Sequence, residues 1–436
     1  MVHAVELAVD AEHGIVVGRK MQVRGLLLEH QIEERVDFRH KSISSVRLLA
    51  KSAPYCKLLN EVAKRIASEI AVHGAISFAQ FMELALYCPI FGYYEKKKDN
   101  PGRHGDFFTS VSVGPLFGEL LGYQFAEWIE QFQVQQEESV HILEAGAHDG
   151  RLAKDILTWM RQSRPGLYER LEYWIVEPSL RRQQWQQAML EDFPEKVAWT
   201  ASLQQLRKGA KTSGVAPILG VPESGVRGII FSNELLDSMP VQRWGWDARK
   251  REWFEWGVGM DERRFVWTRL KPSTVHGPQP GVPADLLPFL ADGFVREIGA
   301  GAQEWWRSAA GLLQCGKLLT FDYGLTEEEL LRPERSQGTL RAYKSHSISH
   351  DVLAAPGEQD LTAHVDFTAI QRAGESAGLR TAQIIFQEQF LMGILSQAEK
   401  NGVAIGNGPA ERKRQFQTLT SPEHFGRLRV LLQEPG

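Results

Sequence analysis

The sequence predicts a doubly wound α/β protein built around a parallel sheet. The first observation behind this is an alternation of strand-length apolar runs with helix-length segments, which is typical of βα units. The expected strands are 140–145, 172–177, 196–200 and 226–232, and the expected helices are 151–162 and 180–191. The second observation is a glycine turn after the first strand, Glu144-Ala-Gly146-Ala-His148-Asp-Gly150. Sheets of this class bind nucleotides at such turns.

A segment with apolar residues at helical spacing precedes the predicted sheet. Apolar residues recur at helical intervals from Leu58 to Ile70, and Ser77 is placed to cap a second helix. We therefore expect a helical region over 57–136. Residues 1–56 lack such a pattern, and we expect a poorly ordered extension there.

Two irregular insertions interrupt the second half of the alternation. Aromatic-rich runs between Arg243 and Leu270 predict a β insertion within about 240–300. Segments that resume the sheet are helix 301–314, strand 317–324, helix 367–378 and strand 381–390, with a second insertion over 325–366. The sheet domain is thus expected over 137–395, and 396–436 is expected to be a C-terminal tail with a helical segment.

Composition and charge narrow the class of protein. The chain has 436 residues, is 43% hydrophobic, and carries 50 basic and 54 acidic residues for a net charge of -4, which offers no electrostatic reason for nucleic acid as the main ligand. Its three cysteines, Cys56, Cys88 and Cys315, lack the paired spacing of a zinc site or disulfide framework, which favours a reducing compartment. No apolar run reaches the roughly 20 residues of a membrane span. Acidic residues in the first 55 positions argue against a transit peptide, so a bacterial cytoplasm is expected, with the mitochondrial matrix as the alternative.

The glycine turn favours one adenosine cofactor over another. Its Gly-x-x-x-Gly spacing lacks the third glycine that brings a helix close to the pyrophosphate of a dinucleotide. Glu144 would repel a diphosphate but attract the cationic aminopropyl group of S-adenosylmethionine. Glu177, at the end of the next strand, can present a carboxylate to ribose hydroxyls. Taken alone, the turn is also compatible with an ordinary strand-to-helix connection that binds nothing.

Polar residues follow the other strands as well. Asn233, Glu234 and Asp237 lie after strand 226–232, and Asp322 ends a later strand. Ligands of open parallel sheets bind beyond the carboxyl ends of the strands, so these groups are candidates to bind a cationic substrate. The alternative makes each of them a helix N-cap or a solvated loop acid.

Two other side-chain groups have competing interpretations. The tryptophans of the β insertion could form an aromatic wall for a guanidinium or ammonium group, although the core of the insertion is the expected place for most of them. They are Trp244, Trp246, Trp253, Trp256 and Trp267. A second group could suggest a metal, but its spacing fits no helical ligand pair, and a hydrogen-bonded loop or a substrate lid is expected instead. It comprises His346, His350, Asp351, His364 and Asp366.

Several motifs in one order resemble the MidA-like family of S-adenosylmethionine-dependent methyltransferases, over roughly residues 57–395. The mitochondrial members of that family are arginine methyltransferases that assist assembly of respiratory complex I. The motifs are Gly92-Tyr-Tyr94, Gly105-Asp-Phe-Phe-Thr-Ser110, Phe117-Gly-Glu-Leu-Leu-Gly122, Asn233-Glu-Leu-Leu-Asp-Ser-Met-Pro240, Asp322-Tyr-Gly324, and 351–357 with 360–367. The resemblance implies a Rossmann-like class I methyltransferase sheet and S-adenosylmethionine as cofactor.

The resemblance also implies roles for residues. The cofactor would be bound by Asp106, Thr109, Ser110, Glu144, Gly146, Gly150 and Glu177, partly from the N-terminal helical region. Asn233, Glu234 and Asp237 would face the methyl acceptor and form the catalytic group, with Asp106 as a further candidate. The turn departs from the family pattern Glu-x-Gly-x-Gly-x-Gly, because His148 occupies the middle position. Its side chain could clash with the methionine moiety or project to solvent.

The expected reaction is in-line attack of an acceptor nitrogen on the sulfonium methyl, with carboxylates orienting a guanidinium and receiving its proton. The expected partner is a protein substrate, such as a complex I subunit. A nicotinamide-dependent oxidoreductase would require the missing glycine. A non-catalytic assembly protein that retains the fold is the other alternative.

Overall fold

The computed structural model describes residues 5–10, 15–20, 60–96, 108–132, 139–207, 225–272, 278–344, 347–349, 351–405 and 410–436. The chain divides into two compact units, residues 1–54 and 55–436. In the first unit, strands β1 (Val5–Asp10) and β2 (Ile15–Lys20) form an antiparallel pair. The rest of the expected extension, 1–56, lies outside the described residues.

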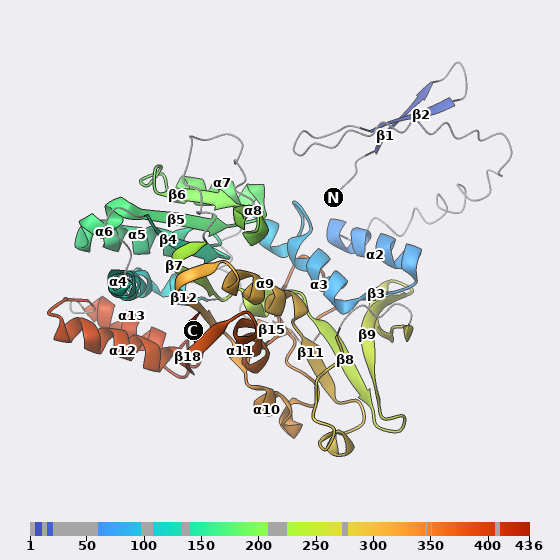
Figure 1. The fold of residues 1–436 in the computed structure, drawn as a ribbon. Coiled ribbons are helices and arrows are strands. Elements are labelled where there is room, and N and C mark those ends of the chain that lie inside the picture. Colours follow the sequence, from blue (N-terminus) through green and yellow to red (C-terminus); the bar gives the residue numbers. More distant parts are fainter. Residues whose placement is uncertain are drawn as a thin grey trace. The chain divides into compact units, whose positions relative to one another are not determined.

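A seven-stranded sheet forms the centre of the second unit, in the order β18-β19-β12-β7-β4-β5-β6 (Figure 1). Its strands are β4 (Val140–Ala145), β5 (Leu171–Val176), β6 (Val197–Thr200), β7 (Val226–Asn233), β12 (Leu313–Asp322), β18 (Leu379–Phe386) and β19 (Arg429–Pro435). The pairs from β6 to β12 are parallel, and β19 runs antiparallel to both of its neighbours. This is the doubly wound α/β sheet that the sequence predicts.

Both faces of the sheet are apolar, because successive side chains along each central strand pack into two different hydrophobic cores. In β4, Ile142 belongs to one core cluster and Leu143 to the other, and in β7 Ile229 and Ile230 are divided in the same way. Side chains of successive strand residues point to opposite faces, so a strand buried on both faces must be apolar throughout. All six residues of β4 and of β5 are accordingly buried.

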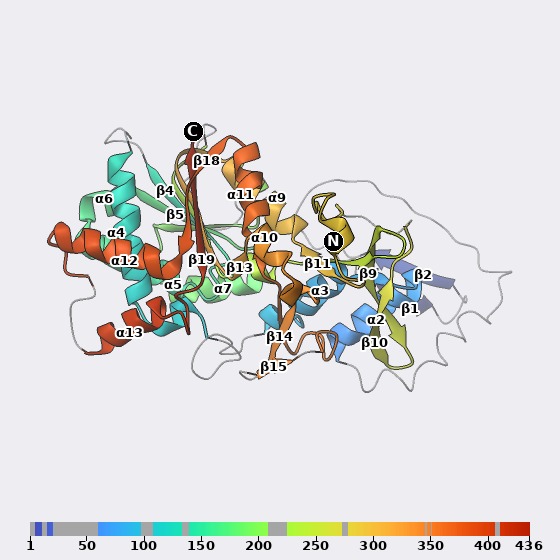
Figure 2. The same ribbon diagram turned by 90° about the horizontal axis from the view of Figure 1, so that it is seen from below.

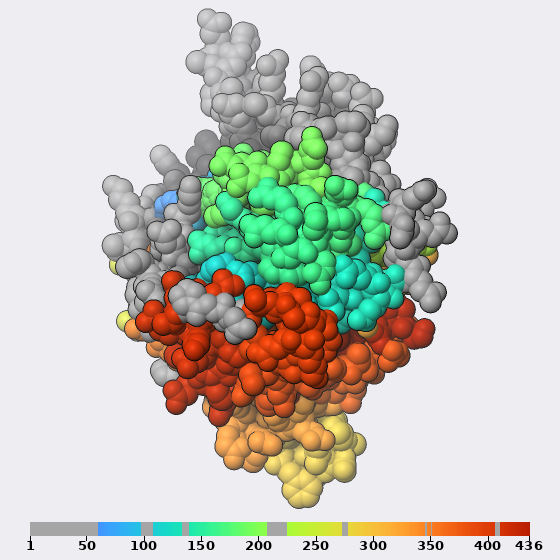
Figure 3. All heavy atoms as spheres, turned by 90° about the vertical axis from the view of Figure 1, so that its left-hand side faces the viewer, coloured from blue at the N-terminus to red at the C-terminus, as the bar shows by residue number. Residues whose placement is uncertain are grey.

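Helices cover the two faces (Figure 2). One core includes α4 (Leu116–Gln131), α5 (Arg151–Ser163), α12 (Gln387–Lys400) and α13 (Ala410–Thr420). The other includes α8 (Leu203–Arg207), α9 (Ala300–Ala310) and α11 (Phe367–Ser376). In the space-filling view of Figure 3, the C-terminal segment that includes α12 and α13 lies beside the region of α4, which both helices contact. None of the helices in the described ranges is long and apolar enough to cross a membrane.

The N-terminal helices pack on a second, antiparallel sheet. Helix α2 (Glu61–His73) begins at the N-cap Asn60, and α3 (Phe78–Tyr87) begins with a capping box between Ser77 and Gln80. The sheet has the order β10-β9-β8-β11, and a short strand, β3, pairs with β9. Its strands are β3 (Ile76–Ser77), β8 (Gln242–Asp247), β9 (Glu252–Asp261), β10 (Arg264–Arg269) and β11 (Val295–Ile298). Phe78, Phe81 and Val258 belong to the shared core.

The remaining elements are short. They are η1 (Tyr93–Glu95), η2 (Ser110–Val113), α6 (Pro165–Arg170), α7 (Leu180–Met189), η3 (Leu236–Ser238), η5 (Leu287–Phe289), β13 (Gly324–Leu325), α10 (Glu327–Leu330), η6 (Pro333–Arg335), β14 (Arg341–Lys344), β15 (Ser347–Ser349), β16 (Asp360–Thr362) and β17 (Val365–Asp366). Strands β14, β15 and β16 form a small sheet inside the second insertion.

The expected C-terminal boundary is wrong. Strand β19 lies in the segment expected to be a tail, and it is inserted between β12 and β18. Its residues Val430, Leu431 and Leu432 are buried, and Leu432 pairs with Leu319. An apolar run this short carries no periodicity of its own, so its pairing with distant strands was not visible in the sequence.

Two element boundaries also differ from expectation. The helix expected to reach 314 ends at Ala310, and β12 begins three residues later at Leu313 with a bulge before Cys315. The strand expected over 381–390 ends at Phe386, where α12 begins. Short apolar runs are compatible with both a helix and a strand, so the sequence does not fix the residue at which one element ends and the next begins.

Candidate active site

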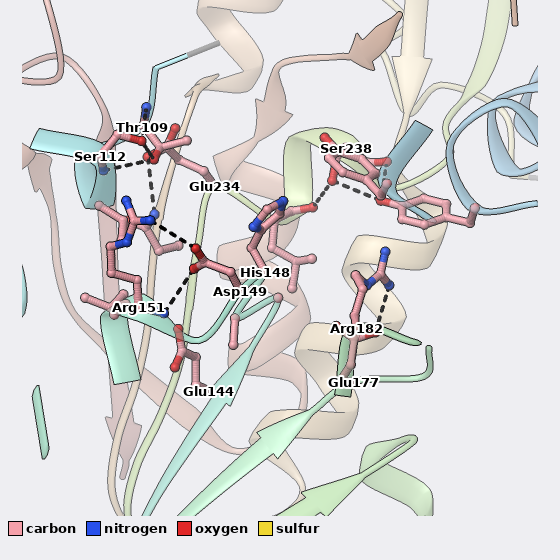
Figure 4. Close-up of a pocket in the computed structure, with 18 residues that line it drawn as sticks. Thr109, Ser112, Glu144, His148, Asp149, Arg151, Glu177, Arg182, Glu234 and Ser238 are labelled. Carbon is pink, nitrogen blue, oxygen red and sulfur yellow. Dashed lines mark hydrogen bonds and ion pairs between the residues drawn. The ribbon is translucent and has the colours of Figure 1, made fainter. Parts of the chain in front are cut away.

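A cavity opens at the carboxyl ends of the parallel strands, where strand order reverses. Strand β4 has β5 on one side and β7 on the other, and ligands of open α/β sheets bind at such a switch point. The lining residues come from the ends of these three strands and from the N-terminal region (Figure 4). They are Tyr87, Tyr94, Thr109, Val111, Ser112, Glu144, Gly146, Ala147, His148, Asp149, Arg151, Leu152, Glu177, Arg182, Asn233, Glu234, Leu235 and Ser238.

The glycine turn after β4 needs an unusual backbone. Gly146, His148 and Gly150 all have positive φ, at 75°, 46° and 88°. A Cβ on Gly146 would lie 2.8 Å from Leu235 Cδ1, so this position requires glycine for both space and conformation. Gly150 is the N-cap of α5 and, unlike Gly146, does not line the cavity.

Glu144, the last residue but one of β4, carries a buried carboxyl group. Its side chain is 2% exposed and accepts a hydrogen bond from Tyr173 Oη at 2.7 Å. Burial raises the pKa of Glu144 to about 8, although the bond from Tyr173 opposes this. A cation bound beside this group would favour its ionised form, which is the property an ammonium site needs.

Glu177 lies at the end of β5 with most of its hydrogen-bonding capacity in use. Its Oε1 accepts from Arg182 Nη2 at 2.8 Å and from the backbone N–H of Ser179 at 2.9 Å. Its Oε2 accepts from Gln186 Nε2 at 3.3 Å. Arg182 also approaches Glu95 of η1, 3.6 Å from its Oε1, so the N-terminal region is tied to the end of β5.

Asn233 and Glu234 reach the cavity from the end of β7. Glu234 has a φ of 49°, and its Oε1 accepts from the backbone N–H of Ser110 at 2.9 Å and from Asn233 Nδ2 at 3.2 Å. Burial raises the pKa of Glu234 to about 7, against the effect of these hydrogen bonds. Asn233 Oδ1 is buried and has no hydrogen-bond partner among the described residues.

Asp237 is buried in η3, and it is not among the residues that line the cavity. Its pKa is raised well above the ordinary value by burial and by the nearby carboxyl groups of Asp322 and Asp360. Asp322 stabilises the backbone around it, because it accepts hydrogen bonds from the N–H groups of Leu235, Leu236 and Tyr323. The expected catalytic group is therefore divided, with Asn233 and Glu234 at the cavity and Asp237 behind it.

The N-terminal part of the expected cofactor site is described only in part. Thr109 lines the cavity and forms a capping box with Ser112 at the start of η2. Ser110 is fully buried, does not line the cavity, and acts through its N–H bond to Glu234. Asp106 lies outside the described residues.

Tyr87, Tyr94 and Arg182 are among the cavity residues to which the sequence assigns no role in the site. Tyr87 donates to the carbonyl oxygen of Ser238 at 3.0 Å, and Tyr94 donates to Asp360 Oδ1 at 2.7 Å. The two tyrosine rings stack with their centroids 5.5 Å apart. The Gly92-Tyr-Tyr94 motif marked this segment, but contacts that join residues 151 and 266 positions apart leave no periodic signal. Arg182 likewise lies within the helix expected over 180–191, and the sequence gives no separate signal for its side chain.

The two other candidate groups do not join this site. The five tryptophans of the β insertion are absent from the cavity lining. In the described part of the chain, no group of three or more His, Cys, Asp or Glu side chains is placed to hold a metal ion. His346 and His350 lie outside the described residues.

Comparison with known proteins agrees with this geometry. Residues 120–385 match the family model Methyltransf_28, a family of S-adenosyl-L-methionine-dependent methyltransferases, and the chain belongs to this family. A COG1565 superfamily member from Burkholderia thailandensis, solved with bound S-adenosyl-homocysteine, has 27% identity and a TM-score of 0.67, over 86% of this chain and 91% of that chain. The protein is thus an S-adenosylmethionine-dependent methyltransferase with a Rossmann-like fold.

The relatives include mitochondrial proteins. "Protein arginine methyltransferase NDUFAF7 homolog, mitochondrial" from Drosophila melanogaster is 27% identical over 86% of this chain and 85% of its own length. "Protein arginine methyltransferase NDUFAF7, mitochondrial" from Danio rerio is 28% identical over 86% of this chain and 87% of its own length.

The cavity residues fit S-adenosylmethionine. Glu144 and Glu234 offer carboxyl groups for a cationic ligand, and the glycine turn brings backbone to the cavity wall. Three buried polar atoms of cavity-lining residues, Asn233 Oδ1, His148 Nδ1 and Arg182 Nε, have no hydrogen-bond partner among the described residues. Buried polar groups in native proteins are nearly always satisfied, so these atoms are suited to bind a ligand.

Proposed function

We propose that this methyltransferase is a protein arginine N-methyltransferase whose acceptor is a subunit of respiratory complex I (NADH dehydrogenase) or a similar protein. The observation that carries the proposal is the Asn233–Glu234 pair, a carboxyl group and an amide that reach the cavity at the end of β7. The mitochondrial relatives are named as protein arginine methyltransferases, which supports arginine as the acceptor residue.

The cavity wall suits a guanidinium group. The stacked rings of Tyr87 and Tyr94 line the same cavity as Glu234. A planar guanidinium pairs with a carboxylate and packs on an aromatic face, whereas a neutral acceptor would gain little from either contact. Ser238, which accepts from Tyr87, holds this aromatic pair to the turn after β7.

The residues at the cavity perform orientation and proton transfer. When bound, S-adenosylmethionine supplies a methyl group on a positively charged sulfur. An acceptor nitrogen held in line with that methyl forms the N–C bond as the C–S bond breaks, and sulfur keeps the electron pair. The guanidinium nitrogen must lose one proton in this step, and its pKa above about 12 excludes loss beforehand. Glu234, with its pKa near 7, receives the proton as the new bond forms.

Glu234→Gln tests this assignment. The variant keeps the hydrogen bond to Ser110 but cannot take the proton, so we expect kcat to fall by roughly 10²–10⁴-fold while the affinity for S-adenosyl-homocysteine changes less than about threefold. The measurement uses tritiated S-adenosylmethionine with isolated complex I subunits and arginine-containing peptides, with mass spectrometry of the product to locate methylarginine.

Glu255→Gln is the matched control. Glu255 is 1% exposed, burial raises its pKa to about 7, and it does not line the cavity. Its substitution tests whether loss of any buried carboxyl group lowers the rate, and we expect methyl transfer to persist. Full activity of Glu234→Gln contradicts the assignment. Cofactor binding by the wild-type protein without methylation of any arginine substrate contradicts the proposed function and favours a non-catalytic assembly protein.

A further inference from the structure

His148 occupies the middle position of the glycine turn, where the family pattern Glu-x-Gly-x-Gly-x-Gly has a glycine. Its φ of 46° is a conformation that glycine adopts freely and that other residues rarely adopt. The side chain lines the cavity, and its Nδ1 is buried without a hydrogen-bond partner among the described residues. The residue is half-buried, and its strained position places a buried polar atom at the cofactor cavity.

A network from α7 fixes His148 beside the end of β5. Gln186 Nε2 donates to the carbonyl oxygen of His148 at 3.0 Å and also to Glu177 Oε2 at 3.3 Å. Trp199 Nε1 donates to Gln186 Oε1 at 2.9 Å and so holds this amide in place. One fully buried glutamine thus couples the backbone of the turn to the carboxylate of Glu177.

Glu177 alone is poorly equipped to bind both hydroxyls of a ribose. A carboxylate has about four acceptor positions, and protein donors from Ser179, Arg182 and Gln186 occupy three. The fourth position can serve one hydroxyl. A second hydroxyl, buried when the cofactor fills the cavity, needs another partner close to Glu177.

We propose that His148 Nδ1 hydrogen-bonds a ribose hydroxyl of the bound cofactor and shares the diol with Glu177. His148 is then a cofactor-binding residue and takes no part in proton transfer from the acceptor. In the view of Figure 4 it lies between Glu234 and the Glu177–Arg182 pair. The inference concerns the cofactor alone, so it stands or falls independently of the acceptor.

The electrostatic surroundings of the ring agree with a hydroxyl as its partner. Burial lowers the pKa of His148, and among the nearby charges Asp149 and Glu177 act against this shift while Arg182 and Arg151 add to it. A neutral imidazole has one donor and one acceptor nitrogen, which matches a hydroxyl group. The ammonium group of the cofactor is better served by Glu144, a buried carboxyl group that also lines the cavity.

The test compares ligands that differ by one hydroxyl. Binding of 5′-methylthioadenosine and of its 2′-deoxy and 3′-deoxy analogues is measured by calorimetry on wild-type protein and on His148→Gly. If the ring binds one hydroxyl, the substitution weakens the intact ligand by about fivefold to tenfold and leaves the affinity for one of the two deoxy analogues unchanged. Equal weakening of all three ligands, or none, overturns the proposal.

A second variant guards against a general effect on the turn. Asparagine tolerates positive φ, so His148→Asn keeps the backbone while it shortens the side chain. We expect it to resemble His148→Gly in its ligand pattern, and thermal unfolding checks that both variants fold. Retained binding of S-adenosyl-homocysteine by the wild-type protein separates failure of this proposal from failure of the cofactor assignment.

Discussion

At the scale of single residues, buried carboxyl groups determine the charge of the cavity, and their protonation depends on the ligand that is bound. Thr109, Glu144, Gly146, Glu177, Asn233 and Glu234 line the cavity, where the sequence places the cofactor and acceptor sites. All of them except Thr109 lie at the ends of strands that the sequence predicts, so their convergence could be predicted, whereas Thr109 precedes the short helix η2. Asp237 could not be placed this way, because η3 turns it behind the cavity within four residues of Asn233.

Glu144 makes cofactor binding depend on pH. Its pKa is about 8 in the structure because the group is buried, so most of it is protonated at pH 7. A bound ammonium lowers that pKa, and binding then releases a proton. Affinity should therefore increase as pH rises from 6 to 8, by at most about tenfold per unit, and level off above 8.

Glu144→Gln separates this effect from titration of the ligand's own amine. Calorimetry with S-adenosyl-homocysteine, in buffers of different ionisation enthalpy, counts the protons released by wild-type protein and by the variant. We expect the wild type to release more protons at pH 7 and the variant to bind less tightly at pH 8. An identical pH profile for the two proteins would show that Glu144 does not face the ammonium group.

At the scale of elements, the sequence predicts the positions of the first four strands of the central sheet, but it does not predict the last strand. Strands β4, β5, β6 and β7 lie within one residue of the expected ranges because each is an apolar run bounded by turn residues. Strand β19 is not predicted, because it has only seven residues and becomes recognisable as a strand only through its pairing with β12 and β18.

Leu431 tests the contribution of β19. It is fully buried and pairs with Thr320 on one side and Ile384 on the other. Leu431→Ala should lower the free energy of unfolding by about 2–5 kcal/mol, measured by urea denaturation. The exposed Leu286 provides the control, and its substitution by alanine should change stability by less than about 0.5 kcal/mol. Similar small effects at both positions would mean that β19 is not an integral strand.

At the scale of the whole molecule, the site is assembled from segments that are far apart in the chain. Residues near 87–94, 109–112, 144–152, 177–182 and 233–238 meet at one cavity, all within the unit 55–436. A parallel sheet predicts which strand ends meet, so the central part of the site followed from the fold class. The approach of Tyr87 and Tyr94 depends on packing between α3, the second sheet and the second insertion, and the amino-acid pattern does not specify it.

The central claim is that this cavity binds the cofactor of a methyltransferase, and Gly146 tests it most directly. A valine at this position would bring Cβ to 2.8 Å from Leu235 and would strain a φ of 75°. Gly301→Ala is the control, since nothing lies within 4 Å of its added Cβ. Calorimetry with S-adenosyl-homocysteine should show saturable binding at one site for the wild type and Gly301→Ala, and at least a hundredfold weaker binding for a folded Gly146→Val. Binding that survives unchanged in Gly146→Val, or no binding by the wild type, would contradict the account.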